Sequence, residues 1–169
     1  MARRRKWAAT VAVLLVAVVV LDQVTKWWAW RHAPVAHVNE GGNPFVGRVV
    51  GGWYADPVTG AFLDLMDFGL LSTALVMLTR RAQPAIIWVS SALMIAGWSS
   101  NLLDRLGMHH LTAPGSYRGA IDFIHIGTYY YNVADFFIGG STVAFLSTAG
   151  YLALSRRSWS ATRPRRETV

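Results

Sequence analysis

The chain contains no cysteine among its 169 residues. This excludes disulfide bonds, thiolate metal sites, cysteine nucleophiles and lipid modification of a cysteine. Charged side chains are also scarce, at 15% of the sequence, whereas hydrophobic residues make up 53% and the mean hydropathy is +0.32. Soluble domains carry more charge than this. The composition therefore predicts a membrane protein with one domain.

Four apolar stretches are long enough to cross a bilayer as helices, a span that takes roughly 17 to 25 residues. They cover residues 7–21 with a mixed continuation to 30, 62–79, 84–103 and 133–154. The first follows a basic cluster, which is also typical of a signal peptide, but no A-x-A cleavage site closely follows it. We therefore predict an all-α membrane protein with four transmembrane helices.

The sixteen lysines and arginines fall unevenly on the two sides of these helices. Eleven lie in residues 3–6, 80–81 and 156–166, on the side that the positive-inside rule assigns to the cytoplasm. Both termini are thus predicted to be cytoplasmic. Residues 31–61 and 105–132 are then predicted to face outward.

The division of the chain follows from the same pattern. Residues 1–155 are predicted to form one integral membrane domain, and the basic segment 156–169 a disordered cytoplasmic tail. In the first outer segment, glycines alternate with valine and tyrosine, which predicts a small extracytoplasmic sheet. The expected fold is a helical bundle with minor β-structure on its outer side.

This topology brings acidic side chains to the outer ends of all four helices. Asp122, in the last outer loop, is close enough in sequence to join them. A carboxylate at membrane depth costs on the order of 2.5–3.5 kcal/mol, so it is kept where it pairs, faces a cavity or does chemistry. We therefore predict a functional site built from carboxylates. The acids at the helix ends are Asp22, Asp64, Asp67, Asp104 and Asp135.

Helical spacing predicts partners for two of these acids. Asp22 and Lys26 are four residues apart, which favours an ion pair on one helical face. Asn101, Asp104 and Arg105 also share a face, where the amide, the carboxylate and the guanidinium can satisfy one another. Both groups are interpreted as structural support for a neighbouring site.

The remaining acids lie near predicted helix starts. Asn132 and Asp135 have i, i+3 spacing at the start of the last helix, where the helix dipole favours an ionised acid. Asp64 and Asp67 are expected to interact with the dipole at the start of the second helix in the same way. We interpret this second pair as structural.

Two carboxylates held close together share a proton, because both cannot ionise easily. Such a pair can hold a water between a general base and a general acid and so hydrolyse a peptide without a metal or a covalent nucleophile. A zinc site built from His109, His110 and His125 is a weaker alternative. The Gly139-Gly140-Ser141 sequence is typical of close helix packing rather than of a serine nucleophile.

The chain contains five short motifs, in the order Asp22-Gln23-Val24-Thr25-Lys26, Asn39-Glu40-Gly41-Gly42-Asn43-Pro44-Phe45, Ser100-Asn101-Leu102-Leu103-Asp104-Arg105, Asp122-Phe123-Ile124 and Asn132-Val133-Ala134-Asp135. In sequence and in order they resemble the motifs of the bacterial lipoprotein signal peptidases, also called signal peptidase II. Ser100 stands where that family has glycine, and residues 106–121 form a longer connection than is usual in the family.

The resemblance implies an aspartic endopeptidase that needs no cofactor and cleaves the signal peptide of prolipoproteins before the diacylglyceryl-modified cysteine. Asp122 and Asp135 would be the catalytic pair. It also implies a monomer in the bacterial inner membrane, with a β cradle and the active site at the extracytoplasmic face. Prolipoproteins and membrane lipids would be its partners, and nucleic acid would not. The residues that would order the site or bind substrate are Asp22, Lys26, Asn39, Asn101, Asp104, Arg105 and Asn132.

Two alternatives stay open at this point. One is a non-cleaving relative that binds lipidated or signal-bearing proteins. The other is a proton-coupled transporter, which uses intramembrane acids of the same kind. A transporter predicts acids at mid-membrane depth, and the placement of these acids at helix ends argues against it.

Overall fold

A computed structural model describes residues 2–34, 36–38, 53, 56–79, 83–116 and 118–161. Four long helices dominate this part of the chain, and all four are long and apolar enough to cross a membrane, as predicted. The sequences that qualify are Trp7–His32, Val58–Met77, Ala85–Thr112 and Val133–Ser155. The helices are α1 (Ala2–His32), α3 (Pro57–Thr79), α4 (Ala85–Leu103) and α6 (Val133–Ala161).

Helix α3 begins five residues before the predicted start because of a local cap. The backbone N–H and the hydroxyl of Thr59 donate to the Asp56 carboxylate at 2.7 and 2.6 Å, and Pro57 occupies the first helical position. An acid followed by proline is a favourable helix start. As a consequence Asp64 lies two turns inside the helix, and the prediction that it meets the dipole of the first turn is wrong.

Helix α6 continues to Ala161, beyond the position where the helix was predicted to end. The first six residues of the segment predicted to be a disordered tail are therefore helical. Residues 162–169 lie outside the described part of the chain.

Two small sheets accompany the helices. Strand β1 (His37–Val38) pairs antiparallel with β2 (Ile121–Asp122), so that His37 lies opposite Asp122. Strands β3 (Ile124–Ile126) and β4 (Tyr129–Tyr131) form a hairpin. The predicted β-structure of the first outer segment is thus present at β1, and residues 39–52 lie outside the described part.

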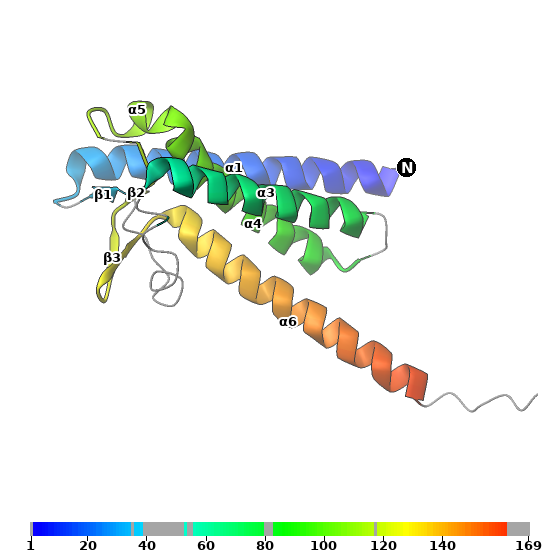
Figure 1. Cartoon of the computed structure of the whole chain (residues 1–169). Helices are drawn as coiled ribbons and strands as arrows, with labels where there is room; N and C mark the ends of the chain where they lie inside the picture. Colours follow the sequence, from blue (N-terminus) through cyan, green and yellow to red (C-terminus); the bar gives the residue numbers. More distant parts are fainter. Residues whose placement is uncertain are drawn as a thin grey trace, which may run out of the picture.

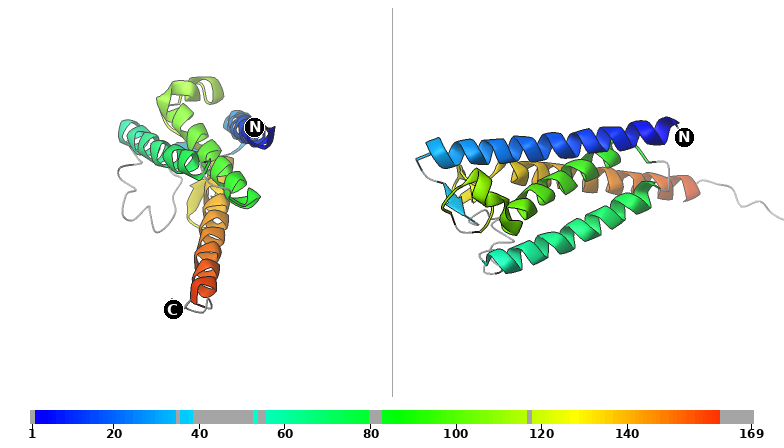
Figure 2. Two further views of the ribbon diagram at one scale, coloured as in Figure 1. Left: turned by 90° about the vertical axis from the view of Figure 1, so that its right-hand side faces the viewer. Right: turned by 90° about the horizontal axis from the view of Figure 1, so that it is seen from above.

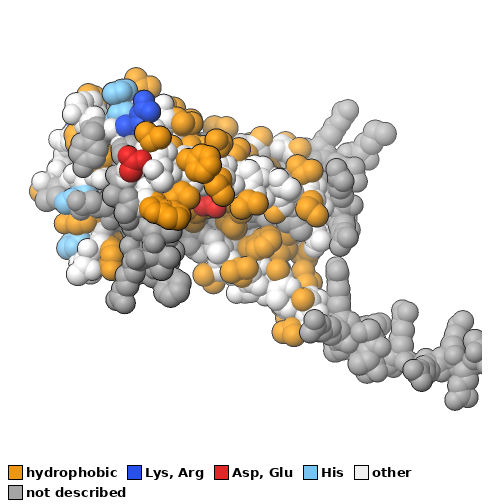
Figure 3. Space-filling view, viewed as in Figure 1, with side chains coloured by type: hydrophobic (Ala, Val, Ile, Leu, Met, Phe, Trp, Pro, Cys, Tyr) orange, Lys and Arg blue, Asp and Glu red, His pale blue; other side chains and the backbone are white. Residues whose placement is uncertain are grey.

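The strands gather at one end of the bundle, where α1 and α4 end and α3 and α6 begin (Figure 1). Helix α6 starts beside α4 at this end and diverges from the other helices toward its C-terminus (Figures 1 and 2). Hydrophobic side chains cover the helical body, whereas histidine, basic and acidic side chains gather toward the strand end (Figure 3). The charged side chains and the histidines seen in this view therefore lie mostly at the same end of the bundle as the strands.

Helix α4 is the centre of the bundle and packs against α1, α3 and α6. In its most apolar window 61% of residues are buried, compared with at most 17% in the other three spans. A Cβ added at Gly97 would lie 2.7 Å from a side-chain carbon of Ile138 and 2.8 Å from the carbonyl oxygen of Ala134. Gly97 thus permits the close approach of α4 and α6. The prediction of close packing at Gly139 and Gly140 is wrong, because an added Cβ there would meet nothing within 4 Å.

The long connection between α4 and β2 is held against α1. It begins with a π-helical turn, η1 (Asp104–Met108), in which Gly107 has φ 122°, and continues as α5 (His109–Thr112). The indole N–H of Trp30 donates to the Pro114 carbonyl at 3.3 Å, and Ala113 is buried with the strand residues Val38 and Ile121. This connection is therefore anchored to the end of α1 beside the strands.

Candidate active site

Lys26 is the centre of a buried polar network at the strand end. Its side chain is fully buried on α1, and its ammonium lies 2.6 Å from Asp22 Oδ2, 2.7 Å from Asp104 Oδ2 and 2.8 Å from Asn101 Oδ1. An ammonium carries three donors, so these three acceptors use all of them. The predicted ion pair of Asp22 and Lys26 is confirmed, and it is shared with Asp104 on the next segment.

Asp22 connects α1 to both α4 and α6. Its Oδ2 accepts a hydrogen bond from the Ser100 hydroxyl at 2.7 Å, and its Oδ1 accepts one from the backbone N–H of Ala134 at 2.8 Å. Backbone N–H groups in the first turn of a helix have no partner within that helix, and the helix dipole favours an anion there. Asp22 therefore caps α6 from another helix.

Asn132 and Asp135 form a reciprocal cap at the start of α6. The Asp135 backbone N–H donates to Asn132 Oδ1 at 3.1 Å, and the Asn132 backbone N–H donates to Asp135 Oδ2 at 2.9 Å. This is the geometry of a capping box, with an amide and a carboxylate in its two positions. The predicted relation between these two residues is confirmed, and it holds the Asp135 side chain against the start of α6.

Asn101 lies between Lys26 and Asp135. Its oxygen accepts from the ammonium, and its side-chain N–H donates to Asp135 Oδ1 at 3.1 Å. Because an ammonium can only donate, the amide oxygen must face Lys26 and the NH₂ group must face Asp135. The orientation of the amide is therefore set by its two partners.

Asp122 joins this network from strand β2. It is buried at 1% exposure, and its Oδ1 accepts a hydrogen bond from the side-chain amide of Asn132 at 2.7 Å. Asn132 therefore contacts both acids, through its side chain to Asp122 and through its backbone to Asp135. Two carboxylates from separate elements meet at one residue.

Arg105 forms its ion pair with Asp64 on α3, and Asp64 is fully buried. Asp104 binds Lys26, and Asn101 binds Lys26 and Asp135. The prediction that Asn101, Asp104 and Arg105 form their hydrogen bonds and ion pairs with one another is therefore wrong. Each of these side chains reaches another helix instead.

Two members of the network were assigned no role from the sequence. Gln23 donates its side-chain N–H to the carbonyl and hydroxyl oxygens of Ser100, at 3.2 and 3.1 Å, and to Asp104 Oδ1 at 3.0 Å. Ser100 is fully buried. Gln23 stands between Asp22 and Lys26 in the first motif. This place in the motif is the sequence feature that could have indicated its role in the network.

The other predicted residues lie elsewhere. Asn39 lies outside the described part of the chain. His109 contacts the Asp104 carbonyl and the ring of His110, whereas His125 stacks on Tyr130 of β4. Among the described residues, no group of three histidine or acidic side chains could hold a metal ion. The zinc alternative therefore has no geometry to support it in this part of the chain.

A family model described as signal peptidase (SPase) II matches residues 14–150, a range that contains every member of this network. The chain belongs to the signal peptidase II family. No curated protein matches the chain in sequence. Signal peptidase II is a membrane-embedded hydrolase of lipoprotein processing, and the four membrane-capable helices of this chain agree with that class.

Proposed function

We propose that this family member is an aspartic endopeptidase that removes the signal peptide of prolipoproteins by cutting immediately before the diacylglyceryl-modified cysteine. One observation carries the proposal, namely that Asn132 holds Asp122 and Asp135 together. Asn132 donates its side-chain N–H to Asp122 and its backbone N–H to Asp135, and two carboxylates held close together favour a pair in which one member is ionised and the other protonated. Such a pair supplies a general base and a general acid at one place.

In the proposed reaction the ionised acid takes a proton from water as the water oxygen bonds to the scissile carbonyl carbon. The protonated acid gives its proton to the carbonyl oxygen. Collapse of the tetrahedral intermediate breaks the C–N bond, the first acid protonates the departing nitrogen, and the hydroxyl proton returns to the second acid. Both carboxyl groups therefore end the cycle as they began it.

The remaining network residues have supporting roles in this proposal. Asn101 and Asn132 orient the two acids, whereas Lys26 and Arg105 bind the carboxylates that hold the helices together. Asp22 and Asp104 belong to this supporting set through Lys26. The part proposed for Asn39, contact with the substrate, rests on its motif alone.

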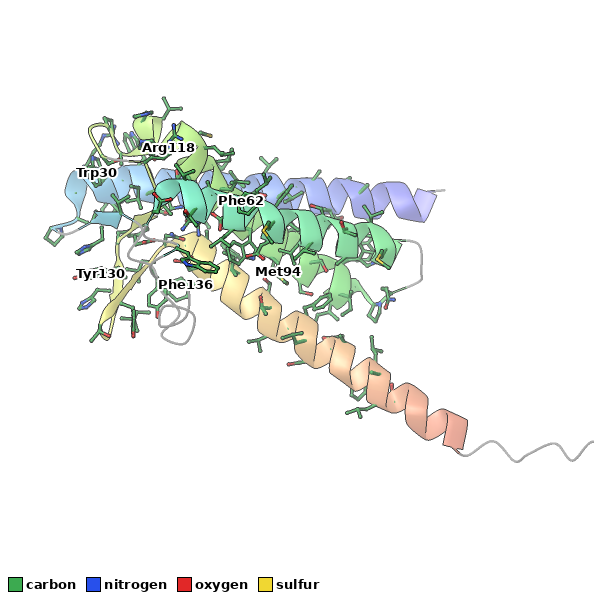
Figure 4. The ribbon with its side chains drawn as sticks, viewed as in Figure 1. Trp30, Phe62, Met94, Arg118, Tyr130 and Phe136 are labelled. Carbon is green, nitrogen blue, oxygen red and sulfur yellow. The ribbon has the colours of Figure 1, made fainter. Side chains whose placement is uncertain are left out.

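We further propose that the site opens to the extracytoplasmic face of the bacterial inner membrane, with both termini in the cytoplasm. The excess of lysine and arginine near the opposite helix ends supports this orientation. Phe136, directly after Asp135, is half exposed at the start of α6 (Figure 4). An apolar surface beside the acids suits lateral entry of the substrate's acyl chains from the bilayer. One copy of the chain supplies all of the proposed residues, which supports a monomer as the active form.

Cleavage of a purified diacylglyceryl-modified prolipoprotein in detergent tests this function. We expect the wild-type protein to cut it and Asp122→Asn or Asp135→Asn to lower the rate by about 10²–10⁴-fold, the usual contribution of an acid–base group. Asp67→Asn is the matched control, because Asp67 lies on α3 and is not among the proposed acids. Full cleavage by either asparagine variant would refute the dyad. A wild-type protein that retains the substrate without cutting it would refute the peptidase.

A further inference from the structure

Ser100 differs from the other serines of α4 in the partner of its hydroxyl. The hydroxyls of Ser90, Ser91 and Ser99 donate to carbonyl oxygens of α4 itself, at 2.7, 2.7 and 2.6 Å. This back-bonding is the common arrangement of serine within a helix. The Ser100 hydroxyl instead donates to Asp22 Oδ2 on α1 at 2.7 Å. The Ser100 hydroxyl therefore links α4 to α1, whereas the hydroxyls of the other three serines bond only within α4.

Both oxygens of Asp22 are engaged, and their partners differ. Oδ2 faces Lys26 and Ser100, and Oδ1 faces the backbone N–H of Ala134. Because the two oxygens are rigidly linked through one carbon, a bond that fixes the first also fixes the second. The Ser100 hydroxyl thus acts together with Lys26 to fix where Asp22 presents the oxygen that caps α6.

Ala134 directly precedes Asp135, one of the two acids of the proposed dyad. We propose that Ser100 is a positioning residue, whose hydroxyl orients Asp22 so that this carboxylate holds the first turn of α6 and with it Asp135. The role rests on the proposed function, because it concerns the placement of an acid of the dyad.

The geometry around Ser100 supports a polar role rather than filling of space alone. Its hydroxyl is a donor to Asp22 and at the same time accepts from the Gln23 side chain at 3.1 Å. Both donor and acceptor are used inside a fully buried site, where an unmade hydrogen bond is costly. Alanine retains the Cβ and the helix propensity and removes only these two interactions.

The test compares Ser100→Ala with Ser91→Ala, a buried serine of the same helix whose hydroxyl bonds only locally. For Ser100→Ala we expect kcat to fall about tenfold with KM unchanged, the order expected when a hydrogen bond to a charged group is lost. Amide exchange at Ala134 should become faster in the same variant. Ser91→Ala should match the wild-type protein in both measurements.

A second comparison identifies the route. If Ser100 acts through Asp22, the loss of kcat in Ser100→Ala and that in Asp22→Asn will not multiply in the double variant. Independent, multiplying effects would overturn the proposal, and so would unchanged kcat and unchanged exchange at Ala134 in Ser100→Ala. Should Ser100→Ala fail to fold, Ser100→Gly is measured in its place, and failure of both to fold would show a folding role and overturn the positioning role.

Failure of this inference is distinguishable from failure of the proposed function. Absence of cleavage by the wild-type protein refutes the peptidase. The exchange rate at Ala134 still reports whether the Ser100 hydroxyl holds the start of α6, because that measurement needs no substrate.

Discussion

The substitution Lys26→Met tests whether one buried cation on α1 stabilises the packing of α1 against α4 and η1. Methionine keeps an unbranched side chain of similar length and removes the charge, so it leaves Asp22 and Asp104 buried without the ammonium that lies 2.6 and 2.7 Å from them. Removing one partner of a buried ion pair costs about 3–5 kcal/mol. Since one lysine serves two carboxylates, we expect a loss in this range, out of a typical total of about 5–15 kcal/mol.

The free energy of unfolding in detergent micelles measures this loss directly. Arg31→Gln is the control, because Arg31 is an exposed cation at the end of the same helix. The double variant Lys26→Met with Asp104→Asn should recover part of the loss. The asparagine removes one of the two buried charges and keeps an oxygen for Gln23, which donates to Asp104 Oδ1 at 3.0 Å.

Two results would refute this reasoning. One is a Lys26→Met protein within about 1 kcal/mol of the wild type, the range of an exposed pair. The other is a double variant that is less stable than Lys26→Met alone. That result would mean that removing the unpaired charge of Asp104 does not stabilise the Lys26→Met protein.

Three further predictions concern other parts of the chain. Asp64→Asn should destabilise the protein by about 3–5 kcal/mol by leaving the guanidinium of Arg105 without its buried anion, and adding Arg105→Gln should recover part of this in the same unfolding assay. Gly97→Ala should cost about 1–3 kcal/mol, because its Cβ would overlap α6, whereas Gly139→Ala should not lower the melting temperature. Hydrogen bonds from the hydroxyl and the N–H of a first-turn threonine lower the pKa of Asp56 below its ordinary value of 3.8. The cap of α3 is therefore present above pH 3.8 and is lost as the pH falls through the folded-state pKa of Asp56. The protection of the amides in that turn, relative to their intrinsic exchange rates, should fall over the same pH range, and Asp56→Ala should abolish this step.

The features predicted correctly from the sequence are those set by local spacing. Hydropathy located all four membrane-capable helices, because a span needs a continuous apolar run. The i, i+4 spacing of Asp22 and Lys26 and the i, i+3 spacing of Asn132 and Asp135 identified two real contacts. In each case the two side chains lie on one helix or at its start, where the helical repeat alone fixes their separation.

The features predicted wrongly depend on how one helix is rotated against another. Spacing placed Asp104 and Arg105 on one face but could not indicate that Lys26 and Asp64, 78 and 41 residues away, were their partners. A glycine sequence cannot indicate close packing either, until the neighbouring helix is placed. For this reason the sequence does not distinguish Gly97, where an added Cβ would meet α6, from the pair at 139–140, where it would meet nothing.

One amide, that of Asn101, separates the Lys26 ammonium from Asp135 of the proposed dyad. Lys26 and Arg105 form ion pairs with Asp22, Asp104 and Asp64, the acids that hold helices together. Asn101 lies between the ammonium, at 2.8 Å, and Asp135, at 3.1 Å. A cation bonded directly to a dyad acid would favour its ionised form and remove the proton that the general acid must donate. An amide N–H that orients the carboxyl group in place of a cation leaves that proton available, which is the condition that acid–base cleavage by two carboxylates requires.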